Sequence, residues 1–182
     1  MEAFIVPLLL IRLMMTNKGH IKEIGDSRVF IVEDNDMHSL MMDYLLSKET
    51  MANIKKFKSG EECIENLNLK PDVVILDYGL PGINGIQTLM QIKKHDPEIP
   101  VIVITGNTDE EVAQNFLDAG VYDYIQKEEN AFEQVSKVTD SILNIMAQKE
   151  AKVEYRQSIV FGWGILILAT LISIISWVLL RH

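Results

Sequence analysis

Ionisable and hydroxyl side chains stand directly after short apolar runs in four places along this chain. The residues are Glu33 with Asp34, Asp77, Thr105 and Lys127. Three carboxylates, a hydroxyl and an amine in one place suit a phosphoryl group, because cations neutralise its charge and the hydroxyl donates to one of its oxygens. Asp77 is then the expected nucleophile, which forms an aspartyl phosphate.

Such a carboxylate cluster needs a cation to stay ionised. Two carboxylates about 4 Å apart repel by roughly 4 kcal/mol at an effective dielectric constant near 20. Oxygen ligands in an open site favour Mg²⁺. Simpler interpretations stay open for single residues: Asp77 as a solvated strand terminus, Lys127 as a surface lysine, and Thr105 as a strand-end residue that bonds its own backbone.

Five short strands are needed to bring these residues together. Apolar runs predict strands at 29–32, 73–76 and 101–104, and we also expect strands near 54–57 and at 122–125. Helices are predicted after Asp36 and over 59–67, 85–95, 109–119 and 131–147. This alternation indicates an α/β fold, a parallel sheet covered on both faces, whose strands all end at one edge where such sheets bind ligands.

The first and last of these helices show apolar stripes at helical spacing. The first has Asp36 as its predicted N-cap and carries Met37, Leu40, Met41, Tyr44 and Leu45. The last carries Phe132, Val135, Val138, Ile142 and Ile145. In the helix over 59–67, Ser59, Glu61 and Glu62 form an acidic start.

Residues 158–180 are predicted to be a transmembrane helix. These 23 residues carry no charge, and at about 1.5 Å per residue they reach roughly 34 Å, against a hydrocarbon core of about 30 Å. Trp163 and Trp177 lie near the two ends, where such rings favour the headgroup level. The alternative is a buried helix of a soluble protein.

The flanking charges predict the orientation of this span. The basic residues before the span are Lys149, Lys152 and Arg156, and only Arg181 follows it. By the positive-inside rule, the domain that precedes the span is expected in the cytoplasm. The protein is thus predicted to cross the inner membrane once. A stripe of mostly small residues within the span is compatible with a homodimer; its members are Gly162, Leu166, Ala169, Ser173, Ser176 and Leu180.

Two segments flank the predicted domain over 28–147. Residues 148–157 are predicted to be a juxtamembrane linker. Two interpretations stay open for residues 1–27: an interfacial extension, or a stretch outside the true product, with translation starting at Met14 or Met15.

Charge and cysteine content exclude several classes of function. Residues 28–147 hold 10 Lys and Arg against 21 Asp and Glu, a net charge of −11. Such a domain repels phosphate backbones, which argues against nucleic-acid binding. The single Cys63 forms no intramolecular disulfide, and the histidines, His38 among them, show no metal-binding or phosphorelay pattern.

Over residues 28–147 the sequence resembles the receiver domain of two-component response regulators. The features that carry this resemblance are the acidic pair Glu33 and Asp34, Asp77 followed by LPGINGI with Pro81 and Gly85, Thr105 in VIVITG, Gly120 in DAG, and Tyr124 three residues before Lys127. The resemblance implies a flavodoxin-like, doubly wound, five-stranded parallel sheet with strand order 2-1-3-4-5, here with one C-terminal transmembrane helix added.

The resemblance also implies a function. A histidine kinase or a histidine phosphotransfer protein passes its phosphoryl group to Asp77, with Mg²⁺ held by Glu33 or its water, Asp34, Asp77 and the backbone carbonyl of Gly79. Thr105 and Tyr124 then reorient and remodel the surface read by a downstream protein effector. The protein is therefore expected to be a signalling phosphoacceptor rather than an enzyme, with no DNA-binding output domain.

Two features depart from the family pattern. Glu128 follows Lys127 where members usually carry Pro, and Glu33 stands where Asp is common. The first departure supports an alternative, a membrane adaptor that uses the receiver fold as a scaffold without phosphorylation, whereas the complete acidic site opposes it. A haloacid-type phosphatase is disfavoured, because Gly79 stands where that chemistry needs a second Asp.

Overall fold

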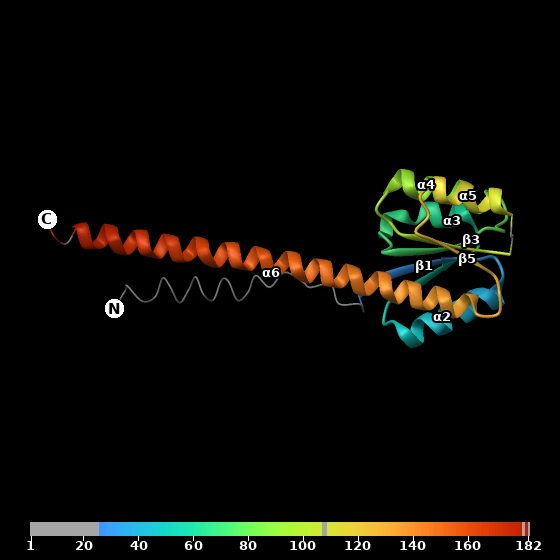
Figure 1. The fold of residues 1–182 in the computed structure, drawn as a ribbon, viewed down its shortest axis with the longest axis horizontal. Coiled ribbons are helices and arrows are strands. Elements are labelled where there is room, and N and C mark those ends of the chain that lie inside the picture. The colour runs from blue at the N-terminus through green and yellow to red at the C-terminus, as the bar shows by residue number, and fades with distance from the viewer. Residues whose placement is uncertain (1–25, 107–108, 180, 182) are drawn as a thin grey trace. The chain divides into compact units, whose positions relative to one another are not determined.

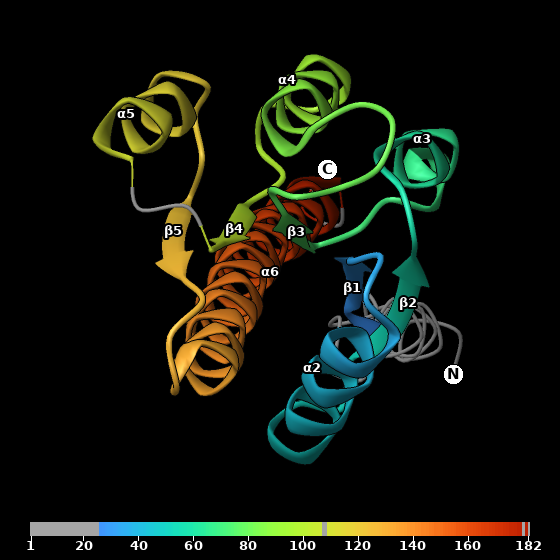
Figure 2. The same ribbon diagram turned by 90° about the vertical axis from the view of Figure 1, so that its right-hand side faces the viewer.

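We describe the protein from a computed structural model, which covers residues 26–106, 109–179 and 181. The described part of the chain divides into two units between Met146 and Ala147, and each unit is treated by itself. The first unit contains a five-stranded parallel sheet with strand order β2-β1-β3-β4-β5 (Figure 2). Its strands are β1 (Arg28–Val32), β2 (Asn53–Phe57), β3 (Val73–Asp77), β4 (Val101–Thr105) and β5 (Asp123–Gln126).

The helices cover both faces of this sheet, as the alternation of strands and helices predicts. The elements are α2 (Asp36–Glu49), α3 (Gly60–Glu65), the short 3-10 helix η3 (Leu67–Leu69), α4 (Gly85–His95), α5 (Glu110–Asp118) and α6 (Ala131–Leu179). The helices α3, α4 and α5 lie on one face, and α2 with the first part of α6 lies on the other (Figures 1 and 2). This is the flavodoxin-like fold that we expected.

Alternate residues of the strands pack into two separate cores, one on each face. Val29, Ile31, Val73 and Ile75 join the layer under α2 and α6, together with Met42, Leu46, Val135 and Ile142. Phe30, Val32, Val74 and Leu76 join the layer under the other three helices, together with Cys63, Leu89, Ile92 and Phe116. Every residue of β3 and β4 is buried, so the sheet holds the ends of its central strands rigidly.

The helix α2 differs from our prediction in its cap. Asn35, not Asp36, is the N-cap, since its side chain accepts from the backbone N–H groups of Met37 and His38 at 2.9 and 3.2 Å. Both residue types are good caps. Asp36 is the first residue inside the helix, and its carboxylate pairs with Lys58 at 2.8 Å.

The buried side of α2 also differs from the stripe that the sequence pattern favours. Ser39, Met42 and Leu46 face the core, whereas the stripe residues Met37, Leu40, Met41 and Tyr44 are exposed and Leu45 is half-buried. Apolar residues occupy both sides of this helix, so periodicity alone favoured the wrong face. The exposed stripe is called the α2 face below.

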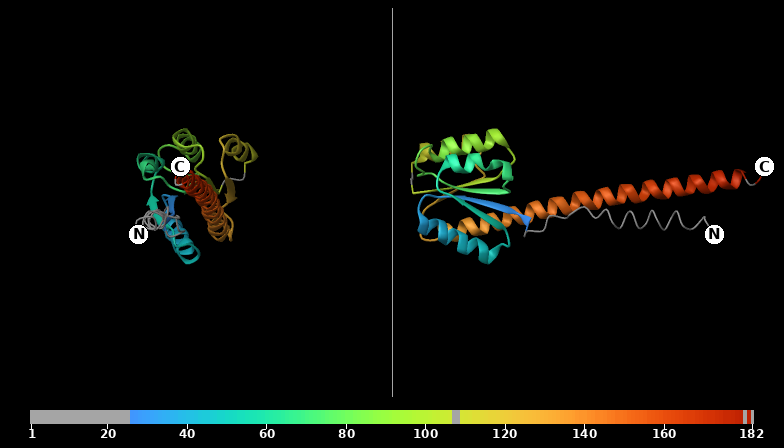
Figure 3. Two further views of the ribbon diagram at one scale, coloured as in Figure 1. Left: turned by 90° about the vertical axis from the view of Figure 1, so that its left-hand side faces the viewer. Right: turned by 180° about the vertical axis from the view of Figure 1, so that it is seen from behind.

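The last helix is longer than predicted, because α6 continues from Ala131 to Leu179 without a break (Figure 3). The predicted linker over 148–157 is therefore helical, which its sequence permits because it contains no glycine or proline. The apolar part of α6 is exposed, and the helix is long and apolar enough to cross a membrane. Leu180 and residues 1–25 lie outside the described part of the chain.

Other boundaries agree with the predictions to within two residues. The helix predicted over 59–67 ends at Glu65, and η3 follows it. The fifth strand begins one residue later than predicted, at Asp123. Gly85–His95 is helical as predicted, with a capping box between Asn84 and Gln87.

Candidate functional site

The strand register brings the predicted site residues to one edge of the sheet. Asp77 is paired with Ile104, next to Thr105, and Thr105 is paired with Gln126, next to Lys127. Glu33 directly follows β1, the other neighbour of β3. Because the strands are parallel and in this order, residues far apart in the sequence meet where the strands end.

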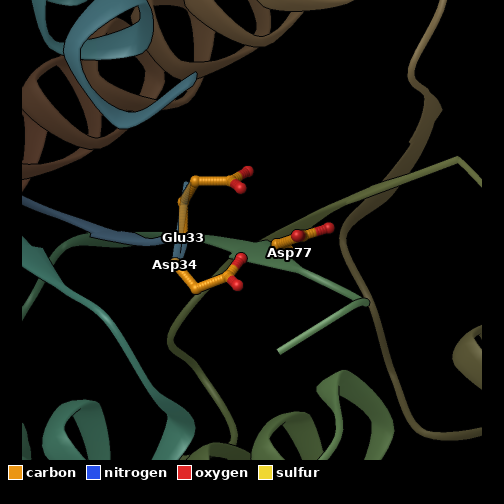
Figure 4. A group of neighbouring side chains, drawn as sticks. All are labelled: Glu33, Asp34 and Asp77. Carbon is orange, nitrogen blue, oxygen red and sulfur yellow. The ribbon is translucent and has the colours of Figure 1, made fainter. Parts of the chain in front are cut away.

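Three carboxylates form a cluster at this edge (Figure 4). Glu33 and Asp34 extend from the chain after β1, and Asp77 extends from the end of β3. One carboxylate oxygen from each lies within 4.8 Å of the other two. Glu33 and Asp77 are 2% and 7% exposed, whereas Asp34 is open to solvent. These hard oxygen donors fit a divalent cation such as Mg²⁺, with one side of the site left open.

Lys127 supplies the counter-charge for two of these carboxylates. Its Nζ lies 3.0 Å from Oδ2 of Asp77 and 3.0 Å from Oε2 of Glu33. Burial lowers the pKa of Lys127, but the attraction of Asp77 and Glu33 outweighs burial and raises the pKa above its usual value. The ammonium group therefore stays charged. The described residues contain no cis peptide bond, and Lys127 reaches Asp77 although Glu128 follows it in place of proline.

Glu33 is held by contacts to both of its oxygens. Oε2 pairs with Lys127, and Oε1 accepts from the backbone N–H of Asn35 at 3.3 Å. Burial raises the pKa of Glu33, and the nearby charge of Asp77 raises it further, while Lys127 and Asn35 act in the opposite direction. A neighbouring cation such as Lys127 thus helps to keep Glu33 ionised.

The sequence pattern did not single out His38 or Asn35, which both lie beside Glu33. His38 Nδ1 is 3.4 Å from Oε1 of Glu33, close enough for ion pairing but not aligned as a hydrogen bond. The His38 ring packs on Phe132 at 5.3 Å. The only sequence signal for the two residues was their position, because both lie at the start of the helix that follows the acidic pair Glu33 and Asp34.

The loop after Asp77 is short and tightly closed. Tyr78 donates its backbone N–H to Ile104, and Gly85 donates to the carbonyl of Tyr78 at 3.2 Å. A Cβ on Gly85 would lie 2.9 Å from the backbone oxygen of Asp77, so no side chain fits there. A Cβ on Gly79 would lie 3.6 Å from Oδ2 of Asp77; the use of the Gly79 carbonyl as a metal ligand stays a prediction.

Thr105 and Tyr124 also contact each other. Thr105 is fully buried. Burial raises the pKa of Tyr124, and a side-chain hydrogen bond with Thr105 partly opposes this shift. The Tyr124 ring lies 5.8 Å from that of Phe116, which in turn lies 5.6 Å from the Tyr78 ring. Thr105 at the end of β4 and Phe116 of α5 are therefore joined through Tyr124 by one chain of contacts.

Comparison with known proteins gives consistent matches over the same region. The family model of the response regulator receiver domain matches residues 29–139. The DNA-binding transcriptional regulator NtrC of Klebsiella pneumoniae is 30% identical over 124 residues, which cover 68% of this chain and 26% of that protein. A protein-glutamate methylesterase/protein-glutamine glutaminase of Clostridium acetobutylicum is 32% identical over 135 residues, which cover 72% of this chain and 37% of that protein. The chain thus spans about a quarter to a third of the length of these relatives.

Solved structures match the fold of the same region. The signal receiver domain of a Luxo repressor protein from Vibrio parahaemolyticus superposes with a TM-score of 0.62 at 27% identity, covering 70% of this chain and 97% of that domain. The BeF3-activated DrrB receiver domain superposes with a TM-score of 0.57 at 28% identity, covering 65% of this chain and 97% of that domain. With the family model matching more than half of its residues, the chain belongs to the response regulator receiver domain family of two-component systems.

Proposed function

We propose that this protein is a membrane-anchored phosphoacceptor of a two-component phosphorelay. The observation that carries this proposal is the position of Lys127, whose Nζ lies 3.0 Å from Asp77 inside a cluster of three carboxylates. A carboxylate at a strand end beside both a cation and a metal-type cluster is suited to attack phosphorus. Receiver domains take their phosphoryl group from a phosphohistidine, so the phosphodonor is a histidine kinase or a histidine phosphotransfer protein.

Each residue at this edge has a defined task in the proposed transfer. The carboxylate of Asp77 attacks the phosphorus, and the histidine nitrogen of the donor leaves. Lys127 and the hydroxyl of Thr105 bind the phosphoryl oxygens. Asp34, Asp77, the Gly79 carbonyl and Glu33, directly or through water, would hold Mg²⁺, which neutralises charge on the phosphoryl group when bound.

The α2 face supports a protein partner. Met37, Leu40, Met41 and Tyr44 are between 51% and 69% exposed, and α2 starts beside Glu33 and Asp34. A contiguous apolar stripe of this kind favours protein contact. We assign this face to docking of the protein phosphodonor, because it begins beside the carboxylates. The acidic charge of the domain opposes nucleic-acid binding, so we propose that the output is contact between a downstream effector protein and the surface that Thr105 and Tyr124 remodel.

Membrane anchoring is supported by the apolar part of α6. Residues 158–179 contain no charged side chain and are exposed almost throughout. The guanidinium of Arg181 stacks on the ring of Trp177 at 4.4 Å, an arrangement suited to the headgroup level. In this proposal residues 158–180 cross the inner membrane once, and residues 148–157 are the helical linker before the span. The receiver domain over 28–147 lies in the cytoplasm. This arrangement is compatible with a homodimer that forms through the small-residue stripe of the span.

The substitution Asp77→Asn tests the proposed function. The full chain in detergent is incubated with Mg²⁺ and acetyl phosphate, and phosphorylation is measured by intact mass. We expect Asp77→Asn to abolish the modification, while the exposed control Asp118→Asn stays like the wild type. Continued modification of Asp77→Asn would contradict the assignment of Asp77 as the phosphoacceptor, and no modification of the wild type would favour the phosphorylation-independent adaptor.

A further inference from the structure

We propose that Glu61 is a positioning residue for the loop Tyr78–Asn84, which is called the acceptor loop below because it follows Asp77. Oε1 of Glu61 accepts from the backbone N–H of Ile83 at 3.0 Å, across 22 positions of sequence. The contact thus joins the first turn of α3 to the loop between β3 and α4. The proposal rests on the proposed function, since it assigns the loop a part in metal and phosphoryl binding.

Close packing around this hydrogen bond leaves little freedom. Gly82 has φ +79°, and a Cβ there would lie 2.4 Å from Oε1 of Glu61. A Cβ on Gly60 would lie 2.1 Å from Oγ1 of Thr88 and 2.8 Å from Cγ1 of Ile83. Two positions without side chains therefore let the start of α3 approach both the acceptor loop and α4.

The two ends of the acceptor loop are held by other contacts. At one end Tyr78 donates to the carbonyl of Ile104, and at the other Asn84 and Gln87 form the capping box of α4. Between these ends lie Gly79 and Gly82, whose backbone is intrinsically free. The hydrogen bond from Ile83 to Glu61 restricts this middle section, and through it the backbone of Gly79, the predicted metal ligand.

Glu61 is well suited to this task although it is exposed. The hydrogen bond from Ile83 lowers the pKa of Glu61, so the side chain is an ionised acceptor at neutral pH. A charged acceptor strengthens a hydrogen bond from a backbone N–H. In the sequence Glu61 was only one of the acidic residues at the start of a helix, a position that the helix dipole alone explains.

The neighbouring Glu62 provides a matched control. It is also exposed and lies in the same turn, but its Oε2 accepts from the backbone N–H of Lys58 rather than from the acceptor loop. Glu61→Ala and Glu62→Ala therefore remove equal charge from the same helix end. Glu61→Gln keeps an oxygen that accepts from Ile83.

The experiment measures Mg²⁺-dependent phosphorylation of the full chain by acetyl phosphate. We expect Glu61→Ala to raise the Mg²⁺ concentration for half-maximal rate about fivefold, since a single hydrogen bond contributes on this scale, with little change in the rate at saturating Mg²⁺. Glu62→Ala is expected to match the wild type, and Glu61→Gln to recover most of the loss.

Hydrogen exchange of the peptide that contains Ile83 gives a readout that needs neither metal nor phosphoryl donor. We expect exchange at this amide to be faster in Glu61→Ala than in Glu62→Ala. Equal exchange in these two variants, or an equal Mg²⁺ requirement, would overturn the positioning role. Failure of the proposed function is distinguishable, because it shows as an unmodified wild type whatever the exchange at Ile83.

Discussion

Nζ of Lys127 lies 3.0 Å from Oδ2 of Asp77, and the same nitrogen lies 3.0 Å from Oε2 of Glu33. Lys127 therefore bridges the proposed phosphoacceptor and the most buried carboxylate of the cluster. This bridge exists although Glu128, and not proline, follows the lysine. One ammonium group thus compensates buried negative charge and, in the proposed transfer, also binds a phosphoryl oxygen.

Replacing Lys127 by Met should affect both tasks. We expect the rate of phosphorylation by acetyl phosphate to fall about 100-fold, because a positioned charge at the transferring group is lost. Without Mg²⁺, the free energy of unfolding should fall by about 3 kcal/mol, because Glu33 loses its buried counter-charge. Kinetic assays and urea unfolding measure the two effects. Lys137→Met, an exposed lysine of α6, is the control; equal effects of the two substitutions would contradict the assignment.

Asp34 and Glu33 should contribute unequally to Mg²⁺ affinity. Both oxygens of Glu33 already have protein contacts, whereas Asp34 is open to solvent. We expect Asp34→Asn to weaken Mg²⁺ binding at least about tenfold, and Glu33→Gln to weaken it less. Isothermal titration of the full chain in detergent measures both. Asp36→Asn serves as the control, since Asp36 pairs with Lys58 outside the cluster, and equal losses for Asp34→Asn and Glu33→Gln would reverse our ranking.

Tyr124 should make stability depend on alkaline pH. Burial is the largest cause that raises the pKa of Tyr124 in the folded state. The folded state therefore holds the phenolic proton more tightly than the unfolded state, in which the pKa of tyrosine is about 10. Its contribution to stability is complete below about pH 10 and is lost as the pH rises through the folded-state pKa. Ultraviolet difference titration of the wild type against Tyr124→Phe measures that pKa. A transition at or below the ordinary tyrosine value would disprove the prediction.

The α2 face should matter for a protein phosphodonor but not for a small one. Leu40→Ser is expected to slow transfer from a phosphohistidine protein about tenfold, because apolar contact area is lost at the docking surface. Phosphorylation by acetyl phosphate should be unchanged, since Leu40 does not belong to the acidic cluster. Met90 on α4 has the same exposure as Leu40, 59%. An equal effect of Met90→Ser would show that the α2 face has no special part.

Membrane topology can be tested by cysteine labelling in intact cells. Burial raises the pKa of the native Cys63 thiol to about 12, so this residue should not react with maleimides and gives a clean background. A cysteine added after His182 should react with a membrane-impermeant maleimide, and Asp26→Cys, at an exposed position next to the buried Ser27, should not. The reverse pattern would overturn both the orientation and the cytoplasmic phosphorelay that depends on it.

The sequence by itself was sufficient for the fold and for naming the side chains that meet at one edge of the sheet. Apolar runs that end on Asp77 and before Glu33 mark buried strands, because only a strand of a covered sheet is both short and wholly apolar. Once the strands are parallel, their carboxyl ends must meet at one edge, which brings Thr105 and Lys127 to the carboxylates. The length and apolar composition of residues 158–180 likewise depend on nothing outside that segment.

Only the tertiary structure decided which side of a helix is buried and which side chains touch. The stripe of Met37, Leu40, Met41 and Tyr44 has the periodicity of a core face, yet α2 packs through Met42 and Leu46 instead. Periodicity shows where apolar residues lie around a helix. Which of its sides faces the sheet depends on the rotation of the helix about its axis, and the path of the chain from the preceding strand to the helix cap sets that rotation.

Contacts between distant residues follow the same logic. His38 beside Glu33 and Glu61 at the amide of Ile83 depend on side-chain directions set by packing of several elements at once. Neither contact leaves a signature in the local sequence, because each partner has an adequate local explanation of its own, a helix turn for His38 and a helix N-terminus for Glu61. The convergence of these side chains at one edge was therefore predictable from residue types and order, whereas the contacts that position them were decided by the folded chain.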